Sequence, residues 1–466
     1  MRCGWSLSVV FLLLVACGPP EPQRETLPVP ERRLRLTPGT AAEEDLAGDG
    51  SRVYLFDLEA GQYAGLTVDQ AGIDIAVTLT APDGRRLTAV DSPNGTEGPE
   101  PVPVVADASG LYRLEVRSLD PKAAPGRYRL RVEGPRLATS TDRTRVSAER
   151  LLATGDVAGV SAAIPLLHSL GDRSREADAL SVLGGLHWTR GDKAEAARAY
   201  ETAVLLFREE GRRKELADAL NGLGIAQVSL GRTEEALGAY REALVVSRAL
   251  GDRAREAATL TNLGRLHTAL GEAESALEDH ERSLALWREI GDRGQEGWAL
   301  VNLGRCAAAL GDDRRAVEGF TAGLPLLEAA GRQREAAGVL GELGLLLGRS
   351  GREREGIARL ERALALQRSL GNRTGEAVAL SDLGNLLEGM GRKTEARRHY
   401  AQALALLEGS GDRLRQPMVL LHLARLEDDS QAAEDLSLRA LRLAEEAGNR
   451  ETQAQALDGL ARVRRR

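Results

Sequence analysis

Apolar residues recur at helical spacing through most of the chain, and glycine interrupts the pattern at regular intervals. Glycine recurs every twenty residues from Gly171 to Gly411 without a miss. The nineteen residues between successive glycines suffice for one helix of about 16 residues and a tight turn. Each glycine is expected to adopt the left-handed conformation that ends a helix. The pattern therefore predicts a stack of helical hairpins.

The true repeat is forty residues, because the two glycines of each unit have different neighbours. A leucine–glycine pair recurs inside the first helix, from Leu183 and Gly184 to Leu383 and Gly384. A glycine inside a helix costs about 1 kcal/mol relative to alanine, so a column of glycines predicts close contact between helices. The second helix carries a mostly aromatic column, whose members are Tyr200, Tyr240, His280, Phe320 and Tyr400.

Before the helical region, the apolar period changes to two. Alternating apolar residues occupy residues 53–58, 75–79, 112–116 and 128–132, with turn-forming residues between them. About seven or eight short strands in this stretch are typical of a small antiparallel β-sandwich. We place this sandwich at residues 46–136.

The leucine–glycine pair, followed by alanine, aromatic and alanine columns, resembles the tetratricopeptide repeat. The forty-residue length resembles the long-helix subgroup that includes kinesin light chains. Residues 56–63 and 110–116 are similar to bacterial pre-peptidase C-terminal modules, especially those that precede such repeats in CHAT-protease-associated proteins. No CHAT domain is recognisable in this sequence, which ends at Arg466.

The resemblance implies a mainly α fold, in which a small antiparallel β-sandwich precedes a tetratricopeptide-repeat superhelix, or α-solenoid. We expect degenerate capping helices at residues 137–170. About seven repeats of forty residues are expected to fill residues 171–466.

The amino terminus resembles a bacterial lipoprotein signal. In residues 1–17, an apolar run follows Arg2 and ends in Leu-Val-Ala-Cys, with Cys17 as the expected lipidated residue. The run is too short to cross a bilayer. The alternative is an ordinary secretory signal with an incidental cysteine. The proline-rich residues 18–45 are expected to form an extended tether. The resemblance implies a lipid-anchored protein of the bacterial cell envelope, with the outer membrane favoured in a Gram-negative host.

Composition and spacing give no indication of catalysis or of nucleic-acid binding. Sixty-two basic residues oppose 69 acidic ones, for a formal net charge of −7, which does not suggest a nucleic-acid partner. We find no phosphate-binding loop, nucleophile elbow or metal-ligand spacing. Cys306 occupies an apolar packing column, so we predict a buried, unreactive thiol. The expectation is a protein that is not an enzyme and has no cofactor or metal.

One stripe on each first helix is not needed for packing and is expected to line the concave groove that the resemblance implies. The predicted peptide-binding residues on this stripe are Asn262, Arg265, Trp298, Asn302 and Arg305. An asparagine and an arginine three residues apart share a helix face and could hold one carboxylate, so the expected partner is a protein or peptide, possibly acidic. The alternative is a solvated polar surface.

These features favour a membrane-anchored scaffold or adaptor that binds a partner protein or peptide in the groove of its repeats. Two alternatives remain open at this point. The chain could be the regulatory subunit of a caspase-like protease supplied in trans, or a structural lipoprotein that binds cell wall or glycan through its sandwich.

Overall fold

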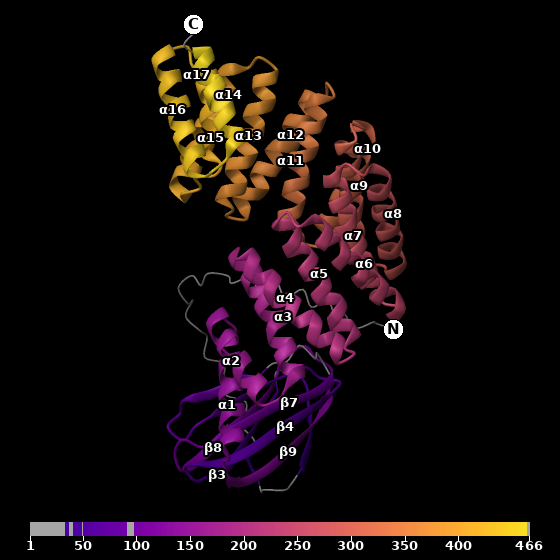
Figure 1. Cartoon of the computed structure of the whole chain (residues 1–466), viewed down its shortest axis with the longest axis vertical. Coiled ribbons are helices and arrows are strands. Elements are labelled where there is room, and N and C mark those ends of the chain that lie inside the picture. The colour runs from indigo at the N-terminus through magenta and orange to yellow at the C-terminus, as the bar shows by residue number, and fades with distance from the viewer. Residues whose placement is uncertain (1–32, 37–40, 49, 91–96, 464–466) are drawn as a thin grey trace. The chain divides into compact units, whose positions relative to one another are not determined.

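The computed structural model describes residues 33–36, 41–48, 50–90 and 97–463. The expected signal with Cys17, most of the expected tether and residues 464–466 lie outside this part. In the described part, nine strands precede seventeen helices, as Figure 1 shows. The chain divides into two compact units, Met1–Val246 and Ser247–Arg466.

Two sheets form the expected sandwich. The first has the order β1-β3-β8-β5-β6 and consists of β1 (Arg33–Arg35), β3 (Ser51–Leu58), β5 (Ile75–Thr80), β6 (Arg86–Val90) and β8 (Gly110–Ser118). The second has the order β2-β9-β4-β7 and consists of β2 (Ala41–Leu46), β4 (Gln62–Ala71), β7 (Glu97–Val105) and β9 (Gly126–Leu137). Strand β1 runs parallel to β3, whereas β3 pairs with β8 in antiparallel register.

Alternation along the strands places apolar side chains between the two sheets. In β5, Ile75, Val77 and Leu79 are fully buried, and the residues between them are partly exposed. The hydroxyl groups of Tyr54 on β3 and Tyr128 on β9 lie 2.6 Å apart in this core. Burial, followed by this hydrogen bond, raises the pKa of Tyr128. One hydrogen bond therefore links the two sheets inside an otherwise apolar interior.

The sandwich begins earlier than the sequence predicts. Strands β1 and β2 lie inside residues 18–45, which we expected to form the tether, so the boundary at residue 46 is wrong. Strand β2 pairs with β9 along its whole length, and Glu43 faces Arg129 in that register. Its apolar signal is weak because it buries only Leu46 fully and otherwise carries acidic and small residues. Oppositely charged side chains face each other across β2 and β9, and a hydrophobic pattern does not reveal such contacts.

An ion pair connects the sandwich to the first helix. Helix α1 (Ser140–Leu152) begins with a capping box in which Thr139 and Asp142 exchange hydrogen bonds. Arg136 at the end of β9 donates two hydrogen bonds to the Asp142 carboxylate, of 2.5 and 2.8 Å. These bonds hold the pKa of Asp142 well below its usual range. Helix α2 (Val157–Ser169) follows.

Twelve helices then form six pairs that follow the forty-residue repeat. They are α3 (Arg173–Arg190), α4 (Lys193–Glu209), α5 (Arg213–Ser229), α6 (Thr233–Leu250), α7 (Arg253–Leu270), α8 (Ala273–Ile290), α9 (Arg293–Ala309), α10 (Asp313–Ala329), α11 (Gln333–Arg349), α12 (Glu353–Ser369), α13 (Arg373–Gly389) and α14 (Lys393–Ser410). The glycines spaced twenty residues apart, from Gly171 to Gly411, all have φ between 62° and 87°. Their predicted left-handed conformation is confirmed.

The glycine column inside the first helices packs against the mostly aromatic column of the second helices, which confirms the predicted close contact between helices. A β-carbon built on Gly224 would lie 2.5 Å from the Tyr240 ring, and one on Gly384 would lie 2.5 Å from the Tyr400 ring. The same contact recurs between Gly304 and Phe320, at 2.9 Å. Since real β-carbons do not approach other atoms this closely, only glycine lets the two helices of each pair come together.

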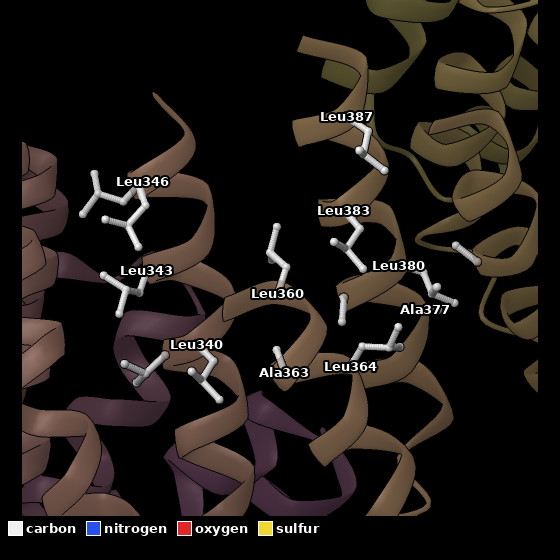
Figure 2. Close-up of a cluster of buried hydrophobic side chains, with 14 of the residues drawn as sticks. Leu340, Leu343, Leu346, Leu360, Ala363, Leu364, Ala377, Leu380, Leu383 and Leu387 are labelled. Carbon is white, nitrogen blue, oxygen red and sulfur yellow. The ribbon is translucent and has the colours of Figure 1, made fainter. Parts of the chain in front are cut away.

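The carboxyl-terminal end of the array departs from the regular repeat. Helix α15 (Gln416–Arg425) has only ten residues and starts with Pro417 in its first turn. Helices α16 (Ser430–Glu446) and α17 (Arg450–Val463) complete the described chain. Within the second unit, leucine and alanine side chains of α11, α12 and α13 form one continuous core, and Figure 2 shows Leu360 lying between Leu343 and Leu383.

Among the helices of the described residues, none combines the length and the hydrophobicity that a membrane span requires.

The close contact in the glycine column predicts that replacing glycine by alanine changes the stability of the chain differently at two positions of α11. A β-carbon on Gly344 would lie 2.7 Å from Leu360 Cγ and 2.9 Å from the Gly356 carbonyl oxygen. Gly344→Ala should therefore destabilise the chain by roughly 1–3 kcal/mol through overpacking. On the same helix, a β-carbon on Gly338 meets no atom within 4 Å, so Gly338→Ala should stabilise it by about 0.5–1 kcal/mol. Urea unfolding followed by circular dichroism measures both effects. Equal shifts in the two variants would contradict close packing at Gly344.

Candidate functional site

The forty-residue repeat places equivalent side chains on the same face of successive first helices in the second unit. Residues three apart share a helix face. Such pairs are Asn302 and Arg305 on α9, Glu342 and Leu345 on α11, and Asp382 and Asn385 on α13. This face is the stripe that the sequence assigned to ligand binding.

Three of the five predicted peptide-binding residues meet around Arg305. Its guanidinium donates two hydrogen bonds to the Glu342 carboxylate, from Nη2 at 2.6 Å and from Nε at 2.8 Å. It also lies over the Trp298 ring, 4.8 Å from the ring centre. A third, longer bond of 3.4 Å runs from Nη1 to Asn302 Oδ1. The carboxylate that we expected from a ligand is thus supplied by the neighbouring repeat.

Asn302 is buried at the edge of this cluster. Its residue surface is only 1% exposed, and its Nδ2 has no hydrogen-bond partner among the described residues. A buried amide donor without a partner costs roughly 1–3 kcal/mol. Asn302 is therefore a buried residue that accepts a long hydrogen bond from Arg305, rather than a solvated surface residue.

The other two predicted residues lie one repeat earlier and do not join the cluster. Asn262 and Arg265 are on α7, where Asn262 is partly buried and Arg265 is exposed. The nearby charge of Arg265, after burial, helps lower the pKa of His280 to about 4. Arg265 has no carboxylate in the next repeat at the position from which Glu342 pairs with Arg305, because the residue equivalent to Glu342 there is Asn302.

An apolar cavity of about 620 Å³ lies beside Arg305. The first helices of three successive repeats, α9, α11 and α13, supply most of its walls. We call this cavity the slot. Its apolar lining consists of Ala308, Phe320, Leu345, Leu346, Leu386 and Met390, and its polar lining of Arg305, Glu342, Arg349, Glu353 and Asn385.

The two arginines of the slot are both engaged by carboxylates of the chain itself. Arg305 binds Glu342 as described, and Arg349 Nη2 lies 3.3 Å from the Asp313 carboxylate. Both of their partners are partly exposed. The positive charge in the slot is therefore already neutralised, at modest energetic gain for such exposed pairs.

Asp382 lies on the face of α13 that continues into the slot. It precedes the slot residues Asn385 and Leu386 by three and four positions, and a β-carbon on Gly341 of α11 would lie 3.6 Å from its Oδ2. Burial raises the pKa of the Asp382 carboxyl to about 6. Its side chain makes no ion pair with any described residue, so this carboxylate is partly desolvated without compensation.

A second polar cluster occupies the next repeat. The Glu388 carboxylate accepts hydrogen bonds from Tyr400 Oη at 2.9 Å and from Arg425 Nη2 at 3.2 Å. The same hydroxyl, which has one proton to share between its two acceptors, also lies 2.7 Å from Asn385 Oδ1, and the Tyr400 ring stacks on His422 with centres 4.8 Å apart. Burial, with the bond to Glu388, raises the pKa of Tyr400. This network fixes Asn385 at the wall of the slot.

The residues that first suggest catalysis have packing roles. Cys306 is 1% exposed and lies in the core, which confirms the predicted burial. His267 on α7 forms a 2.8 Å hydrogen bond with Asp279 on α8 and so ties the two helices of one pair together. The described residues contain no group of three or more histidine, cysteine or acidic side chains arranged to hold a metal ion.

That the stripe binds a ligand stays a prediction, whereas the contacts within it differ from those expected from the sequence. Glu342 and Asp382 are not among the predicted site residues, yet the structure makes Glu342 the partner of Arg305 and leaves Asp382 without an ion pair among the described residues. The signal that could have identified the slot is the spacing of Leu345 and Leu346 in one repeat and Asn385 and Leu386 in the next. Leu345 and Leu386 continue this polar stripe, and both stay partly exposed beside the core.

The helical pairs, their left-handed glycines and their shared core define a solenoid. Residues 175–249, 255–329 and 335–409 match the family model of the tetratricopeptide repeat. The solenoid is therefore built of tetratricopeptide repeats and is preceded by a small β-sandwich, as the sequence predicts.

The solved structures that resemble this chain share little sequence with it. A signal transduction ATPase with numerous domains (STAND) protein, which has a tetratricopeptide repeat sensor, from Pyrococcus horikoshii is 15% identical, with a TM-score of 0.53 over 70% of this chain and 50% of that one. A Rap protein complexed with competence and sporulation factor is 15% identical, with a TM-score of 0.45. The match covers 70% of this chain and 86% of that one. The pre-peptidase C-terminal domain of a collagenase from Bacillus anthracis is 23% identical, with a TM-score of 0.20 over 23% and 99%. Among curated proteins, none matches the chain significantly in sequence.

The environment of Asp382 predicts a pH-dependent gain in stability from Asp382→Asn. The pKa of this carboxyl rises from 3.8 to about 6 on folding, so its ionisation destabilises the folded chain above pH 6 and has no effect well below pH 4. Asp382→Asn should stabilise the chain by roughly 1–3 kcal/mol at pH 8, and this advantage should shrink as the pH falls through 6.

Thermal melting of the two proteins between pH 5 and pH 8 measures this difference. Asp435→Asn, on the exposed face of α16, serves as the matched control and should change the melting temperature little at any pH. A stability difference for Asp382→Asn that does not vary with pH would contradict the raised pKa.

Proposed function

We propose that the chain is a non-enzymatic scaffold that binds a segment of a partner protein in the slot between α9, α11 and α13. The observation that carries this proposal is the slot itself, an apolar cavity whose walls come from three successive repeats. Its volume of about 620 Å³ falls within the range of ligand-binding pockets, about 300–1,000 Å³.

The composition of the slot favours a peptide over a small polar molecule. Leu345 and Leu386 are partly exposed at its walls although each also contacts the core. Partly buried leucines at the centre of a concave surface, with polar residues around them, suit an apolar anchor side chain of a partner. Asn385, held by Tyr400, keeps its amide nitrogen available to a peptide carbonyl.

The Arg305 cluster supports this role by shaping the slot rather than by capturing a charge. Arg305 joins α9 to α11 through Glu342 and covers the Trp298 ring. A ligand carboxylate at this position would have to displace Glu342, whose two hydrogen bonds to Arg305 are already short. A ligand carboxylate is therefore less favoured at Arg305 than the sequence alone suggested.

We further propose that the scaffold is a lipoprotein of a bacterial envelope, anchored through Cys17. This proposal rests on the amino-terminal sequence, where an apolar run ends in Leu-Val-Ala-Cys. Two or three acyl chains on the new amino terminus would give stable membrane attachment, whereas one chain would not. The proline-rich residues that follow would separate the sandwich from the bilayer.

Polar substitution inside the slot should weaken partner capture without unfolding the chain. Leu345→Gln removes apolar contact from the slot wall and should reduce recovery of a cross-linked partner at least tenfold, because anchor pockets carry much of the binding energy. Leu414→Gln is the matched control, since Leu414 is 61% exposed outside the slot. Cross-linking in the encoding organism, followed by mass spectrometry, compares the two. Equal recovery from both variants would place the partner elsewhere.

Removing the lipidated residue should release the chain from the membrane. Cys17→Ser should move the protein to the soluble fraction or leave its signal uncleaved, because no thiol remains to be acylated. Cys3→Ser lies in the segment expected to be removed and should leave membrane attachment unchanged. Fractionation and immunoblotting follow both variants. Processing that is insensitive to globomycin would rule out a lipoprotein signal.

A further inference from the structure

We propose that the slot selects a basic peptide segment, in which an apolar side chain fills the slot and a lysine or arginine two positions away pairs with Asp382. The inference rests on the proposed function, because it specifies the ligand of the same site. It replaces the acidic partner expected from the asparagine–arginine stripe with one of opposite charge.

The charge around the slot that is not neutralised within the chain is negative. Its two arginines are neutralised within the chain, Arg305 by Glu342 and Arg349 by Asp313. Two carboxylates at the slot have no such partner among the described residues. Glu353 lines the slot, and Asp382 lies one helical turn from it on α13. The uncompensated charge that a ligand meets is therefore negative.

The Asp382 carboxylate is partly desolvated. Its side chain is partly buried between α13 and Gly341 of α11, and it forms no ion pair with any described residue. A carboxylate held in this way is not hydrated as well as one on the surface, and a ligand cation restores a favourable environment. Charge complementarity of this kind fixes which partner binds as well as how fast it arrives.

The spacing between Asp382 and the slot matches the spacing of side chains in an extended peptide. Asp382 and the slot residues Asn385 and Leu386 are three and four positions apart on one helix, so their side chains project about 5–6 Å from each other. Side chains two positions apart in an extended peptide lie on one face, about 6.6 Å apart. An apolar anchor and a basic residue with one residue between them fit the slot and Asp382 together.

Three pools of synthetic extended peptides test this inference on the full chain. All carry a fixed leucine and differ only two positions away, where they have lysine, glutamine or glutamate. Fluorescence polarisation should show that the lysine pool binds roughly tenfold or more tightly than the glutamine pool, with the glutamate pool weakest. Asp382→Asn should bring the lysine-to-glutamine affinity ratio close to one, and Asp382→Lys should reverse the preference in favour of glutamate.

Control variants separate the two levels of the proposal. Asp435→Asn should retain the lysine preference, and Leu345→Gln should weaken binding of every pool. If the pools bind and Leu345→Gln weakens them, but lysine has no advantage over glutamine, the charge preference is overturned while the slot stands. If no pool binds, or if Leu345→Gln has no effect on binding, the slot is not the peptide site and both proposals fail. Because Asp382→Asn should not destabilise the fold, loss of the lysine preference cannot be attributed to unfolding.

Discussion

The contact of a second-helix side chain with a glycine of the first helix is the constraint on which the solenoid depends. In each regular pair a tyrosine, histidine, phenylalanine or leucine occupies the place where a β-carbon would otherwise lie. The glycine costs about 1 kcal/mol of helix propensity, and the buried side chain more than compensates for that cost. Tyr200 extends the contact, because it lies against Gly184 in its own pair and Gly222 in the next. The ring therefore sets the spacing within a pair and contributes to the spacing between pairs.

This packing leaves part of one face on each first helix outside the core, and the slot forms there. The leucines of α11 illustrate the division: Leu343 and Leu347 are buried in the core, whereas Leu345 remains partly exposed on the slot side. A stripe that is not required for stability can carry side chains that would be costly elsewhere. Asp382 is such a side chain, since its burial without an ion pair lowers stability at neutral pH. The proposed basic ligand would compensate for the lost hydration of this carboxylate.

Much of the fold could be predicted from the sequence because it is encoded in repeated, local patterns. The left-handed glycines, the Leu183 and Gly184 columns and the burial of Cys306 follow from spacing alone. Strand β2 was not predicted, because its pairing depends on charges that face β9 from a distant part of the chain. The Arg305–Glu342 pair was missed for a similar reason. The two residues are 37 positions apart, and only the side-chain geometry across α9 and α11 decides whether they meet.

Where the repeats agree in sequence they specify structure, so specificity must lie where they differ. The column that contains Asn302 holds glycine, asparagine, asparagine, glutamate, aspartate and histidine in six successive repeats, from Gly222 to His422. Four chemical types at one structurally equivalent position show that packing does not dictate this residue. In the second unit, three successive repeats place different groups in this column. Asn302 lies beside Arg305, Glu342 is the carboxylate partner of Arg305, and Asp382 is a carboxylate without an ion pair among the described residues. Under the proposed function, a ligand that spans several repeats would meet a different polar group on each helix, and the order of those groups would determine the direction and register in which it binds.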